Sequence, residues 1–270
     1  MKLRVIDEFF PHGWNLQEKI DKNYKGMKEV FERFREKYYK PWKQKNIGLT
    51  GIEKKHVTKR INWFEDYLYK LDDLISVHPP KGQKKGWITP QSKFRPSALE
   101  EFVYYLLRDI DLISKLRLKF SNKKVFTGLT ISSKGDIEIK SKDIDLALVA
   151  EREISLGSRK KLIRVPAIAI EVKTYLDKTM LNEAQFTAQL IKRGNPLCHV
   201  YIVAETNAVS VKELPQESPV DEIFILRENS DAKIDIEAVY EFICEIKKSL
   251  SDIKKTVIRR PPGRLLHPGS

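Results

Sequence analysis

Residues 142–174 read KDIDLALVAEREISLGSRKKLIRVPAIAIEVKT, and this stretch decides the fold. Two apolar runs, LALVA and VPAIAI, are separated by a charged segment, which is typical of two strands and their connection. The second run carries no charge, so it predicts a central strand that is buried on both faces. Residues two apart on a strand point to the same side. We therefore expect Glu171 and Lys173 to project together while Val172 packs on the opposite face.

The segments around these strands predict an α/β fold. Apolar spacing predicts helices over 16–45 (ended or bent at Pro41), 54–76, 97–110, 179–193 and 234–250. Runs rich in β-branched residues predict further strands at 125–133, 199–204 and 221–226. Residues 78–97 are rich in Pro, Gly and Lys and predict a loop. This order predicts a central mixed β-sheet flanked by helices, with an N-terminal helical region attached.

The chain is strongly basic: among 270 residues, 50 Lys and Arg against 37 Asp and Glu give a net charge of +13. Such an excess favours a polyanion as partner, although it also aids solubility. No apolar run is long enough for a membrane span. No phosphate-binding loop of the GxxxxGK[ST] type occurs, so ATP is not expected. Cys198 and Cys244 lack the spacing of a disulfide framework or zinc site. We expect both thiols to be buried, in a cytoplasmic protein.

Carboxylates at the ends of neighbouring strands indicate phosphodiester hydrolysis. In this reaction a water loses a proton, the leaving oxygen gains one, and charge builds on the phosphoryl oxygens between them. Asp143 or Asp145 on the first strand and Glu171 on the second can hold Mg²⁺, a hard cation that takes oxygen ligands. The metal lowers the pKa of its bound water and offsets charge in the transition state. The Lys173 ammonium can position the water or stabilise the developing charge.

An Asp on one strand followed by Glu-X-Lys on the next resembles the PD-(D/E)XK nuclease superfamily. Within residues 94–227, the ordered series RPSALEEFVYYL, KDIDLALV, VPAIAIEVKTYLDKTMLNEAQFTAQLIKR, YIVAE and DEIFILR resembles type II restriction endonucleases of the BbvCI kind. The resemblance implies a restriction-endonuclease-like fold and Mg²⁺-dependent cleavage of short asymmetric sites in duplex DNA. It also implies two related, non-identical subunits or active sites.

The resemblance assigns roles to individual residues. Asp145 and Glu171 become metal ligands and Lys173 the catalytic lysine, because the family places its aspartate directly before the apolar run of its strand. The proline of the superfamily name is missing here, and the choice between the two aspartates depends on this placement. Asp143 stays a candidate for contact with a second metal or with a phosphate-binding lysine.

Two helices supply further polar candidates. Glu100 lies at the edge of the apolar stripe of the 97–110 helix, where it either faces a cleft as a metal ligand or completes a capping box with Ser97. Glu101 lies on the opposite side, where we expect solvent. In the 179–193 helix, Glu183 and Gln185 flank the apolar stripe. They either reach the DNA backbone or the surroundings of the site, or they are solvated.

Phosphate contacts are expected in two loops, where simple solvent exposure is the alternative for any one side chain. The candidates are Lys84, Lys85, Trp87, Lys93 and Arg95 before the third helix, and Arg159, Lys160 and Lys161 between the two catalytic strands. Trp87 is suited to stack or wedge against bases. The second group lies between the catalytic strands in sequence, so we expect it near the scissile backbone.

The chain is expected to divide into a helical DNA-recognition or dimerisation region over 1–93, a nuclease core over 94–258 and an irregular basic tail over 259–270. The favoured hypothesis is a Mg²⁺-dependent endonuclease of duplex DNA that cuts one strand per active site. A double-strand cut then needs a second nuclease subunit, identical or not. The alternatives are a non-catalytic DNA-binding subunit and a structure-specific repair or junction nuclease on the same fold.

Overall fold

The computed structural model describes residues 9–76, 93–131, 133–134, 136–156, 159–210 and 217–258. Lys84, Lys85, Trp87 and the expected tail over 259–270 lie outside the described residues. The helices are α1 (Pro11–Asp21), the turn η1 (Tyr24–Gly26), α2 (Lys28–Phe34), the π-helical η2 (Arg35–Tyr39), α3 (Lys40–Gly48), α4 (Lys54–Ser76), α5 (Phe94–Leu107), α6 (Asp111–Lys115), α7 (Lys178–Gly194) and α8 (Ile236–Ile258). Among the helices of the described residues, none has the length and apolarity needed to cross a bilayer.

The predicted mixed sheet is confirmed. Its five strands are β1 (Lys119–Ser121), β4 (Leu146–Leu156), β5 (Arg159–Leu176), β6 (His199–Asn207) and β7 (Glu222–Ile225), and they lie side by side in that order. The neighbours β1, β4 and β5 pair antiparallel, whereas β5, β6 and β7 pair parallel. The AIAI run lies in the centre of the sheet, and Ile168, Ala169 and Ile170 are fully buried.

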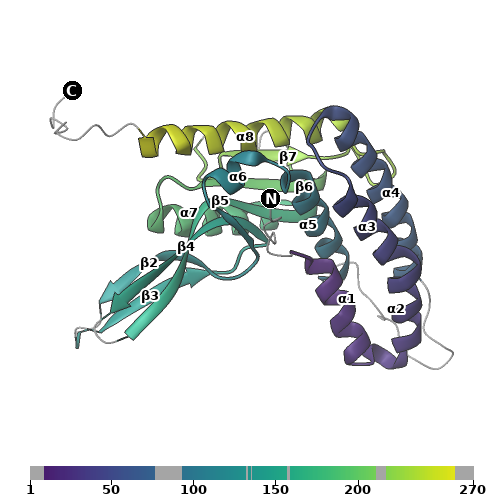
Figure 1. Cartoon of the computed structure of the whole chain (residues 1–270), viewed down its shortest axis with the longest axis horizontal. Coiled ribbons are helices and arrows are strands. Elements are labelled where there is room, and N and C mark those ends of the chain that lie inside the picture. Colours follow the sequence, from purple (N-terminus) through teal and green to yellow (C-terminus); the bar gives the residue numbers. More distant parts are fainter. Residues whose placement is uncertain are drawn as a thin grey trace, which may run out of the picture.

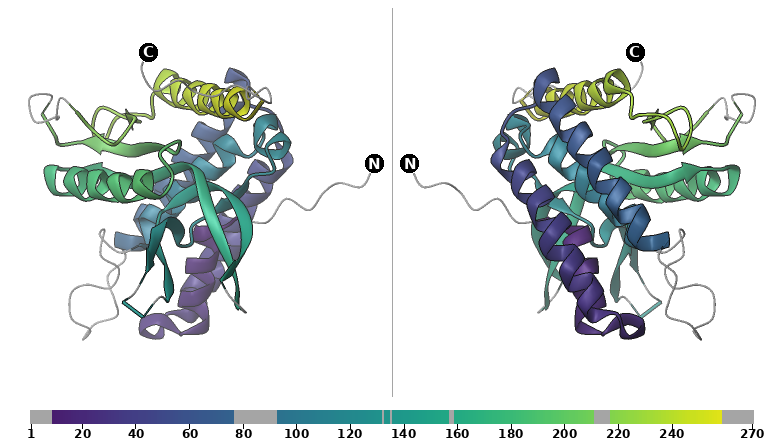
Figure 2. Two further views of the ribbon diagram at one scale, coloured as in Figure 1. Left: turned by 90° about the vertical axis from the view of Figure 1, so that its left-hand side faces the viewer. Right: turned by 90° about the vertical axis from the view of Figure 1, so that its right-hand side faces the viewer.

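Helices cover both faces of this sheet (Figure 1). One apolar cluster joins the α5 and α8 side to inward-facing residues such as Ile168, Ile170 and Tyr201. On the other face, Leu181, Ala184 and Ile191 of α7 pack against Ala169 and neighbouring residues of β4, β5 and β6 in a second apolar cluster. The views in Figure 2 show α7 and α8 as separate layers with the strands between them.

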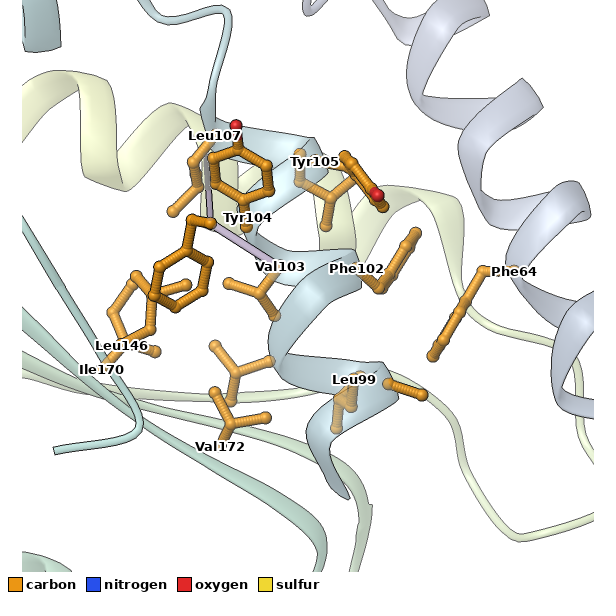
Figure 3. Packing of buried hydrophobic residues seen from close by; sticks show 14 of the residues in the cluster. Phe64, Leu99, Phe102, Val103, Tyr104, Tyr105, Leu107, Leu146, Ile170 and Val172 are labelled. Carbon is orange, nitrogen blue, oxygen red and sulfur yellow. The ribbon is translucent and has the colours of Figure 1, made fainter. Parts of the chain in front are cut away.

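Helix α5 is the centre of the molecule, because it lies between the sheet and the N-terminal helices. Every residue from Ser97 to Leu107 is buried. Figure 3 shows Phe102 pointing to Phe64 of α4 on one side, with Ile170 and Val172 of the sheet on the other. The two phenylalanine rings are stacked, with centroids 4.1 Å apart. The first apolar cluster therefore continues without a break from the helical region across residue 93 into the sheet.

The prediction of one helix over 16–45 is wrong. The chain turns at Asn23, Lys25 and Gly26, which all have positive φ, and the two helical halves run back along each other. Apolar spacing continues across this turn because both halves bury the same side, so periodicity alone does not show the break. Pro41 does not end the helix, because η2 and α3 continue through Tyr39 in the αR conformation, and the π-helical turn of η2 lies just before the proline.

Several short elements are absent from the sequence prediction. Besides α6 and β1, a strand β3 (Ile137–Lys142) pairs with β2 (Val125–Ile131) in a separate two-stranded sheet. Cys198 is buried as expected, but Cys244 is exposed. The prediction for Cys244 is wrong because α8 turns Phe242, Ile243 and Ile246 to the core and this thiol away from it.

The β2–β3 hairpin rests on the end of α7 at a glycine. A Cβ atom at Gly194 would lie 2.5 Å from the carbonyl carbon of Thr127 in β2. The sequence marks Gly194 as a helix stop. The structure continues α7 through this residue, and the close approach of the hairpin explains the glycine.

We predict that Gly194→Ala lowers the free energy of unfolding by about 1–3 kcal/mol, because the added methyl group must push the β2 backbone away. Gly48→Ala is the matched control. Gly48 also ends a helix, and no atom lies within 4 Å of its Cβ position. Its substitution should leave stability unchanged or slightly raised, because alanine favours the helix. Urea unfolding of both variants measures the difference, and equal midpoints would contradict the hairpin–helix contact.

Candidate active site

Three charged side chains meet where β4 begins and β5 passes beside it. The Nζ atom of Lys173 donates to Glu171 Oε2 at 2.7 Å and to Asp145 Oδ2 at 3.3 Å. Asp145 lies one residue before the paired residues Leu146 and Ile170, which places it across from Glu171. The backbone N–H of Val172 donates to Asp145 Oδ2 at 2.9 Å and holds this carboxylate against β5. As expected, the Val172 side chain packs on the opposite face.

These side chains line an open cleft of about 470 Å³. Asp143 lies on its rim and is exposed, whereas Asp145 is half-buried and directly contacts the lysine. The geometry therefore favours Asp145 over Asp143 as the inner carboxylate. Glu183 of α7 also lines the cleft. Gln185 points elsewhere, and its buried Nε2 has no hydrogen-bond partner within the described part of the chain.

The charges in the cleft are strongly coupled. Burial, together with repulsion from Asp145, raises the pKa of the Glu171 carboxyl to about 7. Burial alone would lower the pKa of the Lys173 ammonium, but the two carboxylates raise it above its usual value. The ammonium lies between two carboxylates, which is where a cation is most favourable.

Glu100 belongs to a second, smaller hollow of about 240 Å³ that adjoins the cleft. The capping-box alternative is wrong, because α5 begins at Phe94 and Ser97 lies inside the helix, where its hydroxyl donates to the Phe94 carbonyl at 2.7 Å. Burial, and then repulsion from Asp145, raises the pKa of the Glu100 carboxyl to about 8. The structure gives this carboxyl no hydrogen bond to the described residues, so Glu100 is a buried acid that faces the site without a partner.

The expectation that Glu101 is solvated is wrong, because the side of α5 opposite its apolar stripe packs against the N-terminal helices. Glu101 is fully buried, and its Oε2 atom accepts hydrogen bonds from the backbone N–H groups of His12 and Gly13, each at 3.1 Å. Its Oε1 atom accepts from the hydroxyls of Tyr105 at 2.7 Å and Tyr39 at 3.1 Å. Glu101 thus satisfies N–H groups in the first turn of α1.

His12 completes this buried polar group. Its Nδ1 lies 3.1 Å from the Phe94 carbonyl, and its Nε2 lies 2.6 Å from the Tyr67 hydroxyl. Burial lowers the pKa of His12 to about 3, so the imidazole is neutral. Burial also raises the pKa of the Glu101 carboxyl to about 7, although hydrogen bonds from Tyr105, Gly13 and Tyr39 act in the opposite direction. These contacts join α1, α4 and α5 into one unit.

The oxygen donors of the cleft fit a hard divalent cation such as Mg²⁺. Within the described ranges, no three His, Cys, Asp or Glu side chains group closely enough to enclose a metal by themselves. Magnesium usually keeps several waters and binds one or two protein carboxylates. Asp145 and Glu171 form such a pair. The Lys173 ammonium contacts both carboxylates, so positive charge is favourable at this position.

The expected DNA contacts fall into three groups. Lys93 lines both hollows and is exposed. Arg95 is instead engaged within the protein, because its guanidinium pairs with Asp72 and Glu205 and ties α5 to α4 and β6. We therefore no longer assign it to phosphate binding.

Lys160 and Lys161 are not beside the cleft. They lie in β5 opposite Ser155 and Ile154, nine and eight residues along β4 from Leu146, which corresponds to roughly 26–30 Å. The expectation that this cluster lies near the scissile backbone is therefore wrong. Arg159 begins the same strand. Strands β4 and β5 are so long that their paired ends at Leu156 and Arg159 lie far from the cleft at Leu146 and Ile170 (Figure 1).

Asn122 is a site residue that sequence reasoning missed. It follows β1 and lines both hollows, as do Lys93 and Asp145. No local motif marks it, because β1 is only three residues long and its pairing with β4 brings Asn122 to the site. Trp14 and Asn15 of α1 line the smaller hollow for the same non-local reason.

Two comparisons with known proteins identify a family and a similar fold. A sequence model of the Bpu10I restriction endonuclease family matches residues 91–252, more than half of the chain. A solved structure described as the native BbvCI A2B2 tetramer at low resolution has a similar fold, with a TM-score of 0.70 and 23% sequence identity. The match covers 93% of this chain and 98% of that chain. No curated protein sequence matches the chain. The resemblance and the fold class inferred from the sequence are confirmed.

We predict that Glu101→Ala lowers the free energy of unfolding by about 2–4 kcal/mol, because four buried donors lose their acceptor. Glu101→Gln keeps one acceptor oxygen and should lose less. The neighbouring Glu100→Gln is the matched control. It removes a buried carboxyl that accepts no hydrogen bond from the described residues, and it should leave stability unchanged or higher. Urea unfolding followed by tryptophan fluorescence measures all three. Equal losses at positions 100 and 101 would contradict the assigned contacts.

Proposed function

Because the chain belongs to the Bpu10I restriction endonuclease family, we propose that it is a Mg²⁺-dependent endonuclease that hydrolyses one strand of a specific duplex DNA site per active site. The observation that carries this proposal is the contact of the Lys173 ammonium with both Asp145 and Glu171 in an open cleft. Two carboxylates that can hold a metal ion, with an ammonium beside them, suit phosphodiester hydrolysis. The net charge of +13 supports a polyanionic substrate.

Asp145 and Glu171 would hold the metal, and Glu100 would supply a further carboxylate from the adjoining hollow. When bound, Mg²⁺ lowers the pKa of a coordinated water and offsets the charge that develops on the phosphoryl group. The Val172 N–H fixes the direction of the Asp145 carboxylate, so this ligand needs little reorganisation. Lys173 donates hydrogen bonds and would orient the attacking water or stabilise a phosphoryl oxygen.

The DNA backbone would be held at several distances from the cleft. Lys93 and Asn122 line its edge and would contact phosphates next to the one that is attacked. Arg159, Lys160 and Lys161 would contact the backbone farther along the duplex. Lys84, Lys85 and Trp87 remain proposals from the sequence. Asp143 and Glu183, on the walls of the cleft, are accessory candidates that could bind a second cation or a water near the reacting phosphate.

A second subunit is part of the proposal. The structurally similar protein is described as an A2B2 tetramer, and cutting both strands needs two active sites, whereas one chain supplies one. The same fold therefore supports a chain that acts beside an identical or related partner.

Lys173→Ala should bind target DNA within about threefold of wild type but cut it at least about 100-fold more slowly, because the donor to the reacting groups is lost. Lys248→Ala is the control, since Lys248 is an exposed residue of α8 that pairs with Glu245. Incubation with plasmid of known sequence, with Mg²⁺ or EDTA, followed by sequencing of the ends, measures cleavage and maps the site. EDTA should stop cutting. Normal cleavage by Lys173→Ala, or scattered ends, would remove the proposal.

Strand number is a separate prediction. An assembly with one wild-type and one Lys173→Ala subunit should convert supercoiled plasmid to the open circle, because one of its two centres is inactive. The assembly with two intact centres should produce linear DNA. Size-exclusion fractions assayed on agarose gels make this comparison. Linear DNA formed by a monomeric fraction in a single binding event would contradict one strand per active site.

A further inference from the structure

The smaller hollow beside Glu100 has walls from two distant parts of the chain. It shares Lys93, Asn122 and Asp145 with the catalytic cleft, so the two spaces are continuous at that edge. Helix α1 forms the opposite wall, where Trp14 and Asn15 are among the lining residues. A substrate that reaches the catalytic carboxylates therefore also meets the N-terminal helix.

Helix α1 is held firmly in this position. Glu101 accepts hydrogen bonds from its first turn, and the Asn15 side chain donates to the Lys93 carbonyl at 3.2 Å. Phe9 contacts the Trp14 ring edge to face, with centroids 5.9 Å apart. Trp14 is nevertheless 48% exposed, so a large aromatic surface is presented beside the active site without being needed for the core.

The chemistry of the hollow excludes most ligands. The hollow holds about 240 Å³, less than the roughly 300–1,000 Å³ of typical small-molecule sites, so it has room for one base with its sugar but not for a larger ligand. Three of its lining residues, Glu18, Glu100 and Asp145, carry carboxyls, and only Lys93 at the shared edge carries an ammonium. Glu18 is partly neutralised by an ion pair with Lys22. A phosphate inside would meet repulsion, whereas at the edge it would meet Lys93 and the Asn122 amide. An uncharged group with an aromatic face suits the interior.

We propose that this hollow receives the nucleoside adjacent to the scissile phosphate, with Trp14 stacking against its base. The inference rests on the proposed function, because it places this nucleoside relative to a phosphate attacked at Asp145 and Glu171. Lys93 and Asn122 contact the linking phosphate at the boundary of the two hollows. The base leaves its own stack, and the indole replaces the stacking that it loses. Trp14 is thus a substrate-contact residue on the helical region.

The test is a double-mutant cycle that combines a change in the protein with a change in the DNA. Trp14→Ala and Trp14→Phe are compared with wild type on a duplex that contains the mapped cleavage site. The duplex is either intact or carries an abasic tetrahydrofuran residue on one side of the scissile phosphate or the other. Tyr69→Ala is the control, because Tyr69 is a more exposed aromatic residue of α4 that lines neither hollow. Thermal unfolding verifies that the variants are folded.

On the intact duplex, Trp14→Ala should cut about tenfold more slowly, as expected for one base–aromatic contact, while Trp14→Phe and Tyr69→Ala stay within about threefold of wild type. On one of the two abasic duplexes, wild type and Trp14→Ala should cut at the same rate. The inference would be overturned if the cleavage rates of wild type and Trp14→Ala were nearly equal on intact DNA. It would also be overturned if the ratio of these two rates were unchanged on both abasic duplexes. A wild-type chain that cuts no DNA would instead remove the proposed function, and the inference with it.

Discussion

The burial of α5 from Ser97 to Leu107 is the constraint on which the rest of the molecule depends. A helix with solvent on one side can leave that side polar, but α5 has the sheet on one side and the N-terminal helices on the other. Its two consecutive glutamates therefore both enter the interior, about 100° apart around the helix axis. Glu101 finds four donors and binds the helical region to the core, whereas Glu100 faces the hollow next to Asp145. One helix thus supports the fold with one carboxylate and serves the site with the next.

Buried charged groups that have partners in the protein differ from a buried charged group that has none, and this difference distinguishes structural from functional residues. Glu205 is paired with Arg95 and Arg227, and the fully buried Arg60 is paired with Asp109. Buried polar groups in native proteins are almost always bonded in this way, and exceptions concentrate at functional sites. Glu100 is such an exception among the described residues, and it lies beside the two carboxylates, Asp145 and Glu171, that Lys173 contacts. The excess of carboxyls over ammonium groups is unfavourable for the protein alone. It becomes favourable in a substrate complex that brings cations.

The sequence predicted the parts of the site that depend on local periodicity. Glu171 and Lys173 face the same way because a strand alternates with a period of two, and this alternation can be followed in the printed residues. The direction of Glu101 depends on what packs against the far side of α5, so an amphipathic-helix argument placed it in solvent. Asn122 and Trp14 reach the site through a three-residue strand and a helix turned back at Asn23, and neither has a periodic signal. Local spacing thus predicts which side chains share one face of a helix or strand. Packing between distant elements decides what lies against that face.

Strand β5 also carries a one-residue β-bulge. This irregularity determines which residues on either side of it point to the same face of the sheet. Between Leu148 and Val149 of β4 the partner changes from Ile168 to Pro166, so one residue of β5 is left over. Proline is tolerated at this kind of irregularity. A single inserted or deleted residue between the bulge and the cleft would exchange the inner and outer faces and carry Glu171 away from Asp145. Matched changes of two residues in both strands beyond the bulge would only lengthen or shorten the hairpin. Evolution can therefore change the length of the β4–β5 hairpin by two residues per strand at a time while the hydrolytic centre stays the same.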